Sequence, residues 1–103
     1  MPDSGKQRCP LEEAYAFATK HGLGSHTGNV EKMAQGYKIN GHISSSIVRR
    51  GYLIELFLKH NLLNEFKAEY WVYGTTPKGD TELNSCLRTY AAWCQETGRT
   101  GLL

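Results

Sequence analysis

The segment from Ser44 to His60 constrains the fold more than any other part of the chain. Three consecutive serines precede the run Ile47-Val-Arg-Arg-Gly-Tyr-Leu-Ile-Glu-Leu-Phe-Leu-Lys-His. Serine hydroxyls accept hydrogen bonds from the unpaired N–H groups at a helix N-terminus, and apolar residues recur along the run at helical spacing. The pattern predicts one helix that starts near Ser44 and ends at Asn61 or Asn64.

This predicted helix has two contrasting faces. Gly51 costs about 1 kcal/mol of helix propensity relative to alanine, so we expect a close backbone approach of another element at this residue. The opposite face is basic and hydroxylic near the helix start, where a DNA-reading helix presents its side chains. The first face carries Ile47, Gly51, Ile54 and Leu58, and the opposite face carries Ser45, Arg49, Tyr52 and Leu56.

Periodicity and chain breakers predict the remaining elements. Two glutamates suit the first turn of an early helix and Gly22 ends it, whereas Gly36 and the Asn40-Gly41 pair interrupt the chain again. Residues rich in β-formers then alternate in part. We therefore expect a helix from Leu11 to Gly22, a short helix from Asn29 to about Tyr37, one or two strands around Phe66–Tyr73, and a last helix from Asp80 that Gly98 closes.

The order of these elements resembles a winged helix-turn-helix domain. The segment Ser44–Phe66 is similar to the recognition helix and the start of the wing in MarR- and PadR-like regulators. Tyr73–Leu83 is similar to the wing pattern that follows, although Gly74 stands where an apolar strand residue is usual. The resemblance covers residues 28–90 and implies a mainly α fold with a small β-hairpin, in the order α-α-α-β-β-α. Its matching residues are Thr76, Gly79 and Leu83.

Length and composition bound the class of protein. The chain of 103 residues suffices for one domain, and no apolar run approaches the roughly 18–20 residues that cross a bilayer. The N-terminus has no apolar stretch behind its charges, so we expect no secretory signal. The irregular spacing of Cys9, Cys86 and Cys94 favours free thiols and a cytoplasmic location. We expect a flexible arm over 1–10, one winged-helix-like domain over 11–97 and a tail over 98–103.

These features predict a double-stranded DNA-binding protein, either a transcriptional regulator or a DNA-recognition module. A net charge of +2 does not by itself imply nucleic-acid binding. Arg49 nevertheless lies on the outward face, from which an arginine reaches guanine O6 and N7 in the major groove. Arg50 is rotated toward the flank, where we expect a phosphate contact. The predicted DNA-contacting residues are Ser44, Ser45, Ser46, Arg49, Arg50, Tyr52, Lys67 and Lys78.

The aromatic residues Tyr70, Trp71 and Tyr73 have two interpretations. Aromatic side chains on a strand can stack on unpaired bases, but three of them on a short strand more often pack beneath neighbouring helices. We favour core packing for this group.

A protein-interaction module is the alternative function. The low net charge and the acidic C-terminal part favour it, and Leu53, Leu56 and Phe57 form an apolar patch if they are exposed. A small phage or mobile-element protein that inhibits a host enzyme belongs to this class. A homodimer through the last helix is also expected on this interpretation, with its seam formed by Leu83, Leu87, Tyr90 and Cys94.

Catalysis is not expected. The histidines are scattered, and Cys9 with His21 and His26 is the only near cluster of metal-ligating residue types, without zinc-site spacing. The chain has no Gly-x-Ser-x-Gly motif and no phosphate-cradling loop. We therefore predict a non-enzymatic protein without a metal or other cofactor.

Overall fold

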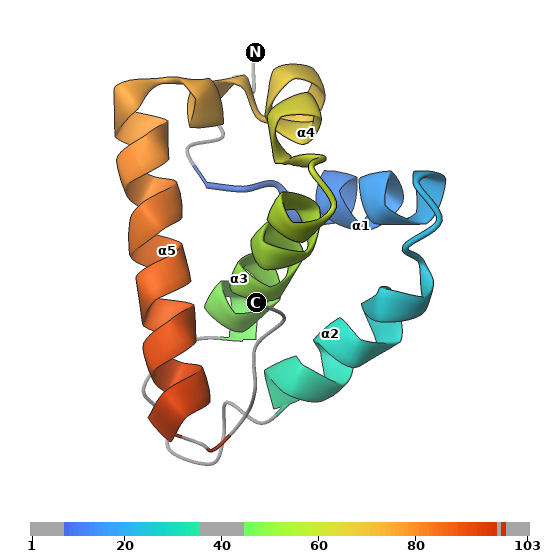
Figure 1. Cartoon of the computed structure of the whole chain (residues 1–103), viewed down its shortest axis with the longest axis vertical. Helices are drawn as coiled ribbons and strands as arrows, with labels where there is room; N and C mark the ends of the chain where they lie inside the picture. Colours follow the sequence, from blue (N-terminus) through green and yellow to red (C-terminus); the bar gives the residue numbers. More distant parts are fainter. Residues whose placement is uncertain (1–7, 36–44, 97, 99–103) are drawn as a thin grey trace.

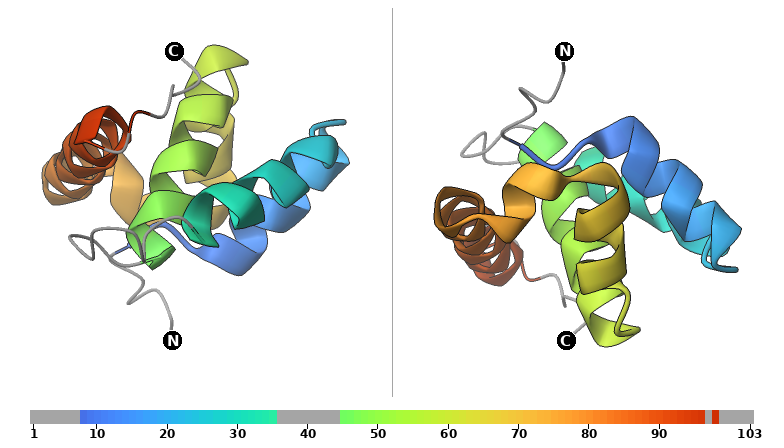
Figure 2. Two further views of the ribbon diagram at one scale, coloured as in Figure 1. Left: turned by 90° about the horizontal axis from the view of Figure 1, so that it is seen from below. Right: turned by 90° about the horizontal axis from the view of Figure 1, so that it is seen from above.

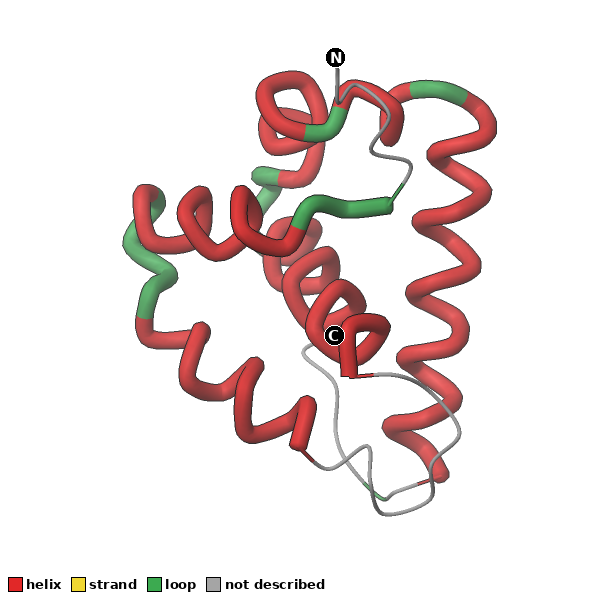
Figure 3. The backbone as a smooth tube through the Cα atoms, turned by 180° about the vertical axis from the view of Figure 1, so that it is seen from behind, coloured by secondary structure: helices red, strands yellow, loops and turns green. Residues whose placement is uncertain are grey.

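The computed structural model describes residues 8–35, 45–96 and 98, and these residues form an all-helical fold (Figure 1). The described residues contain no strand (Figure 3), so the predicted winged helix-turn-helix with a β-hairpin is wrong. The predictions for Ser44, for Tyr37 and for the chain breaks between 36 and 41 lie outside the described residues. The elements are α1 (Leu11–Lys20), α2 (Ser25–Gln35), α3 (Ser45–Lys59), α4 (Leu63–Tyr70), the 3-10 helix η3 (Val72–Thr75) and α5 (Pro77–Glu96).

The segment predicted as a strand is helical because its apolar residues have helical spacing. Leu63 and Phe66 are both buried in α4 and lie three residues apart, on one face of the helix. Glutamate, lysine and alanine between Phe66 and Tyr70 favour a helix over a strand. Trp71 then turns the chain into η3 and is itself buried. Core packing, the favoured interpretation, is confirmed for Trp71, whereas Tyr70 stays exposed and Tyr73 is half-buried.

Helices α1 and α3 end where the sequence predicts, in the same left-handed capping motif. Gly22 follows α1 with φ 78°, and the N–H of Leu23 donates to the carbonyl of Ala18 at 2.8 Å. Asn61 follows α3 with φ 60°. Glycine and asparagine tolerate this conformation better than other residues, so both helices terminate here.

Helices α2 and α5 begin earlier than predicted, and the start of α5 has a side-chain cap. Helix α5 starts at Pro77, whose missing N–H costs nothing in a first turn. The hydroxyl of Thr76 accepts a hydrogen bond from the N–H of Gly79 at 3.1 Å and so caps this end. Helix α2 starts at Ser25, where the Thr27 hydroxyl donates to the carbonyl of Gly24 at 2.7 Å.

Helix α3 is the centre of the fold. It contacts all four other α-helices, with α5 on one side and α1 and α2 on the other (Figures 1 and 2). Residues 51–57 of α3 are buried on every side, as expected for a helix surrounded by other helices. None of the described helices is long and apolar enough to cross a membrane.

Helix α3 approaches α5 closely at Gly51. A Cβ atom at Gly51 would stand 2.4 Å from both Cβ and Cγ of Tyr90. Real Cβ atoms do not come this close to their neighbours, so the contact requires glycine. The predicted close backbone approach at Gly51 is confirmed.

The packed part of the chain begins before α1. Cys9 is 2% exposed and Pro10 is also buried, although both belong to the segment that the sequence assigns to a flexible arm. Figure 3 shows this segment entering α1 from the side of α5. A cavity lies beside this contact.

Candidate functional site

The residues predicted to contact DNA do not form one exposed helix face. Ser45 and Ser46 lie in the first turn of α3, Lys67 lies half-buried on α4, and Lys78 is exposed in the first turn of α5. Tyr52 is only 4% exposed, and its hydroxyl lies 3.3 Å from Nδ1 of His26 in α2. The predicted DNA-contacting residues that the structure describes therefore lie on three different helices, α3, α4 and α5. DNA binding through α3 stays a prediction.

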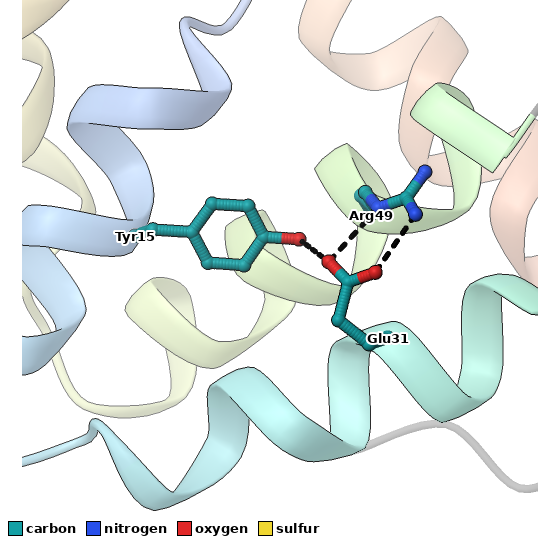
Figure 4. A network of polar contacts seen from close by, with 3 residues as sticks. All are labelled: Tyr15, Glu31 and Arg49. Carbon is teal, nitrogen blue, oxygen red and sulfur yellow. Dashed lines mark hydrogen bonds and ion pairs between the residues drawn. The ribbon is translucent and has the colours of Figure 1, made fainter.

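Arg49 joins three helices instead of standing alone on a surface. Its Nε and Nη2 atoms donate to the two carboxylate oxygens of Glu31 at 3.1 and 2.8 Å, and the hydroxyl of Tyr15 donates to the same carboxylate at 2.7 Å (Figure 4). Tyr15, Glu31 and Arg49 belong to α1, α2 and α3 respectively. The bidentate pair therefore links α2 to α3, the Tyr15 hydrogen bond links α2 to α1, and the positive charge of Arg49 is matched by a carboxylate.

The same contacts shift two pKa values. Hydrogen bonds from Arg49 and then from Tyr15 lower the pKa of Glu31 from 4.5 to about 2. Burial, followed by the hydrogen bond to Glu31, raises the pKa of Tyr15 to about 12. The side chains of Glu31 and Arg49 are therefore both charged at neutral pH.

This network predicts a specific loss of stability in acid. A carboxylate whose pKa is lowered by folding stabilises the protein above its unfolded pKa, and this stabilisation is lost as the pH falls from about 4.5 to about 2. Because the pair is partly exposed, we expect a contribution below about 1 kcal/mol that shrinks in high salt. Urea unfolding between pH 6 and pH 2 should show a shallower acid limb in Glu31→Gln than in the wild type. An unchanged acid limb would contradict the assignment, and Arg49→Met should reproduce the effect from the other side of the pair.

The apolar residues that motivated an interaction surface lie in the core. Leu53, Leu56 and Phe57 are all 0% exposed. On α5, the predicted dimer seam faces inward: Leu83, Tyr90 and Cys94 are each at most 5% exposed. Neither set is available to a partner in this conformation. A homodimer through the last helix stays a prediction, and it needs a different face of α5.

A cavity of about 190 Å³ lies between the segment before α1, the first half of α3 and the middle of α5. We call it the Arg50 cavity. Its walls combine charged, hydroxyl, thiol and apolar side chains contributed by segments far apart in the sequence. The lining residues are Arg8, Cys9, Ile47, Arg50, Ile54, Trp71, Glu82, Leu83, Ser85, Cys86 and Thr89.

Arg50 connects two of the segments that line this cavity. Its Nε atom donates to the backbone carbonyl of Cys9 at 2.8 Å, which ties the N-terminal segment to α3 across 41 residues of sequence. The Cys86 thiol donates weakly to the carbonyl of Ile47, with a separation of 3.9 Å. Both contacts close the wall between α3 and its neighbours.

The two thiols of the cavity are protonated at neutral pH. Burial raises the pKa of Cys9 to about 12, although the positive charge of Arg50 acts in the opposite direction. Burial also raises the pKa of Cys86. A thiol is a weak nucleophile compared with a thiolate, so these cysteines line the site without supplying reactive groups. None of the three cysteines forms a disulfide, as predicted.

Sequence analysis singled out Arg50 but not its surroundings. It placed Arg50 against a phosphate on the flank of a helix, whereas the structure brings Arg50 together with Cys9 and Cys86. No local pattern joins these three residues, because they belong to segments about forty residues apart. Among the described residues, no group of three or more histidine, cysteine, aspartate or glutamate side chains is placed to hold a metal ion.

Comparison of the chain with family models, with curated proteins and with solved structures finds no match.

Proposed function

We propose that this chain is a non-enzymatic binding domain that takes up a small organic molecule in the Arg50 cavity. The observation that supports this proposal is the cavity itself, in which charged, hydroxyl and thiol side chains lie opposite apolar side chains between helices. Pockets between helices are a common position for ligand sites. The proposal retains the predicted absence of catalysis and places binding in a cavity whose rim includes the exposed residues Arg8, Glu82 and Ser85.

The size of the cavity limits the ligand. An apolar cavity of about 150 Å³ engineered in another protein accommodates benzene, and the Arg50 cavity has about 190 Å³. It therefore has room for one six-membered ring with a short substituent. A whole nucleotide or peptide segment does not fit inside this volume, so the enclosed group is a small one.

The chemistry of the lining favours binding over turnover. The thiols of Cys9 and Cys86 are kept protonated by burial, as their raised pKa values show. The remaining polar side chains are two guanidinium groups, one carboxylate and two hydroxyls. These groups orient a ligand through hydrogen bonds and charge.

The test uses three ring compounds of nearly equal shape: cyclohexanecarboxylate, cyclohexylmethanol and cyclohexylmethylamine. We expect at least one to bind the full chain at pH 7 with roughly millimolar affinity or better, as is usual for ligands of this size. Nuclear magnetic resonance titration should show saturable shifts at residues of the Arg50 cavity, and binding should raise the melting temperature.

A pair of variants on α5 makes the test specific. Thr89→Phe places a ring inside the cavity and should abolish binding, whereas Ala92→Phe places the same ring on an exposed part of the same helix and should leave binding intact. Absence of binding by all three compounds, or equal binding to Thr89→Phe, would show that the cavity is not a ligand site.

A further inference from the structure

Building on the proposed function, we infer that the ligand of the Arg50 cavity is a small organic anion. Its carboxylate or phosphate group pairs with the guanidinium of Arg50, and its apolar body lies against Ile54, Trp71 and Leu83. Three features of the cavity favour an anionic ligand: the orientation of Arg50, the excess of positive charge, and the apolar wall.

The guanidinium of Arg50 is fixed in orientation and retains donor capacity. Its Nε atom is committed to the carbonyl of Cys9 at 2.8 Å, which sets the plane of the group. Within the described part of the chain, its two terminal nitrogens have no hydrogen-bond acceptor. Arginine binds carboxylate and phosphate groups through two parallel hydrogen bonds, so the anchor is already oriented before the ligand arrives.

The charges that line the cavity leave an excess of one positive charge. Arg8 and Arg50 contribute two guanidinium groups, and Glu82 contributes one carboxylate. The thiols of Cys9 and Cys86 add no negative charge at neutral pH, because burial raises the pKa of each. A negatively charged ligand neutralises this excess, whereas a cationic ligand increases it.

The apolar wall determines the rest of the ligand. Ile54 is 1% exposed, Trp71 2% and Leu83 5%, and all three line the cavity. Because these side chains already expose almost no surface, the gain comes from the ligand. A ring or branched chain buries its own apolar surface against them, whereas an inorganic anion such as phosphate has no apolar surface to bury. The combination therefore favours an anion that carries an apolar group over a free inorganic ion.

The experiment compares the three ring compounds by their charge. Titration calorimetry of the full chain at pH 7 should give the tightest binding for cyclohexanecarboxylate, weaker binding for cyclohexylmethanol and the weakest for cyclohexylmethylamine. Arg50→Met, which keeps much of the apolar stem, should weaken carboxylate binding at least about tenfold, since a hydrogen bond to a charged group is lost. The affinity for the alcohol should change little in this variant.

Further variants and probes keep the inference testable if Arg50→Met fails to fold. Arg8→Met leaves the Arg50–Cys9 hydrogen bond in place and should weaken carboxylate binding more than alcohol binding. Arg88→Met, on the exposed side of α5 and outside the cavity, is the matched control. Cyclohexyl phosphate and inorganic phosphate separate an organic anion from a free ion.

The outcomes distinguish this inference from the proposed function. An anion site is supported if the carboxylate binds most tightly and if both Arg50→Met and Arg8→Met weaken its binding. Binding of the alcohol or the amine as tight as that of the carboxylate overturns the anionic ligand and leaves the binding function standing. Binding of inorganic phosphate at least as tight as that of both organic anions also overturns the inference. Absence of any binding overturns both.

Discussion

A Gly51→Ala variant is expected to unfold at a markedly lower temperature than the wild type. The new Cβ atom would lie 2.4 Å from Cβ and Cγ of Tyr90, and Tyr90 is 0% exposed and cannot turn away. Relief requires α3 and α5 to separate. Overpacking of a filled core typically costs about 1–3 kcal/mol and sometimes more, and this contact lies at the upper end because it involves atoms next to the backbone. The gain in helix propensity, about 1 kcal/mol, offsets only part of it.

Gly28→Ala is the matched control for this variant. Gly28 is also helical, but it lies exposed on α2, and a Cβ atom there has no neighbour within 4 Å. The substitution should stabilise the protein by about 0.5–1 kcal/mol through helix propensity alone. Thermal unfolding of both variants gives the comparison, since 1 kcal/mol corresponds to about 4–8 °C in a domain of this size. Equal melting temperatures for the two variants would show that α3 and α5 do not approach as described.

Phe17→Ala is expected to cost about 3–5 kcal/mol, the range observed for truncation of a buried phenylalanine. The ring of Phe17 is 1% exposed and lies at the centre of an aromatic cluster between α1, α3 and α4. Ring centroids of Phe57 and Phe66 lie 5.1 and 5.4 Å from it, and that of Tyr70 lies at 5.8 Å. Small domains have a free energy of unfolding of about 5–15 kcal/mol. The substitution therefore removes a large share of the stability of the folded protein.

Two further substitutions locate this effect in the cluster. Phe17→Leu keeps most of the apolar volume and should cost less than about 1.5 kcal/mol. Tyr70→Ala removes a ring from the exposed edge of the same cluster and should cost less than Phe17→Ala. Chemical denaturation of the three variants measures the order directly. A loss for Tyr70→Ala as large as that for Phe17→Ala would contradict the central position of Phe17.

The sequence predicted the helices whose ends carry a recognisable signal. Gly22 and Asn61 stop α1 and α3 in a left-handed conformation that these residues adopt at low cost, so both ends were found. The start of α5 was missed although Thr76 and Pro77 form a recognisable start, because the resemblance assigned Thr76 to a wing. The segment from Phe66 to Tyr73 was predicted as a strand because aromatic residues dominate it, whereas its apolar spacing is that of a helix.

The roles of the arginines depended on partners that no local pattern contains. Arg49 lies on α3 as predicted, but Glu31 lies 18 residues earlier and neutralises it. Arg50 pairs with a carbonyl 41 residues away. A helical wheel shows which face of a helix a residue occupies, but it does not show which other helix covers that face.

The amino-acid sequence alone determined where α1 and α3 end, that the cysteines form no disulfide and that a glycine in α3 marks a close contact, because these properties follow from backbone conformation and local spacing. Only the tertiary structure decided that α3 is enclosed by its neighbours and that Arg8, Arg50 and Cys86 border one cavity. The physical reason is that burial and ion pairing depend on the relative placement of helices, and packing between segments distant in sequence sets that placement.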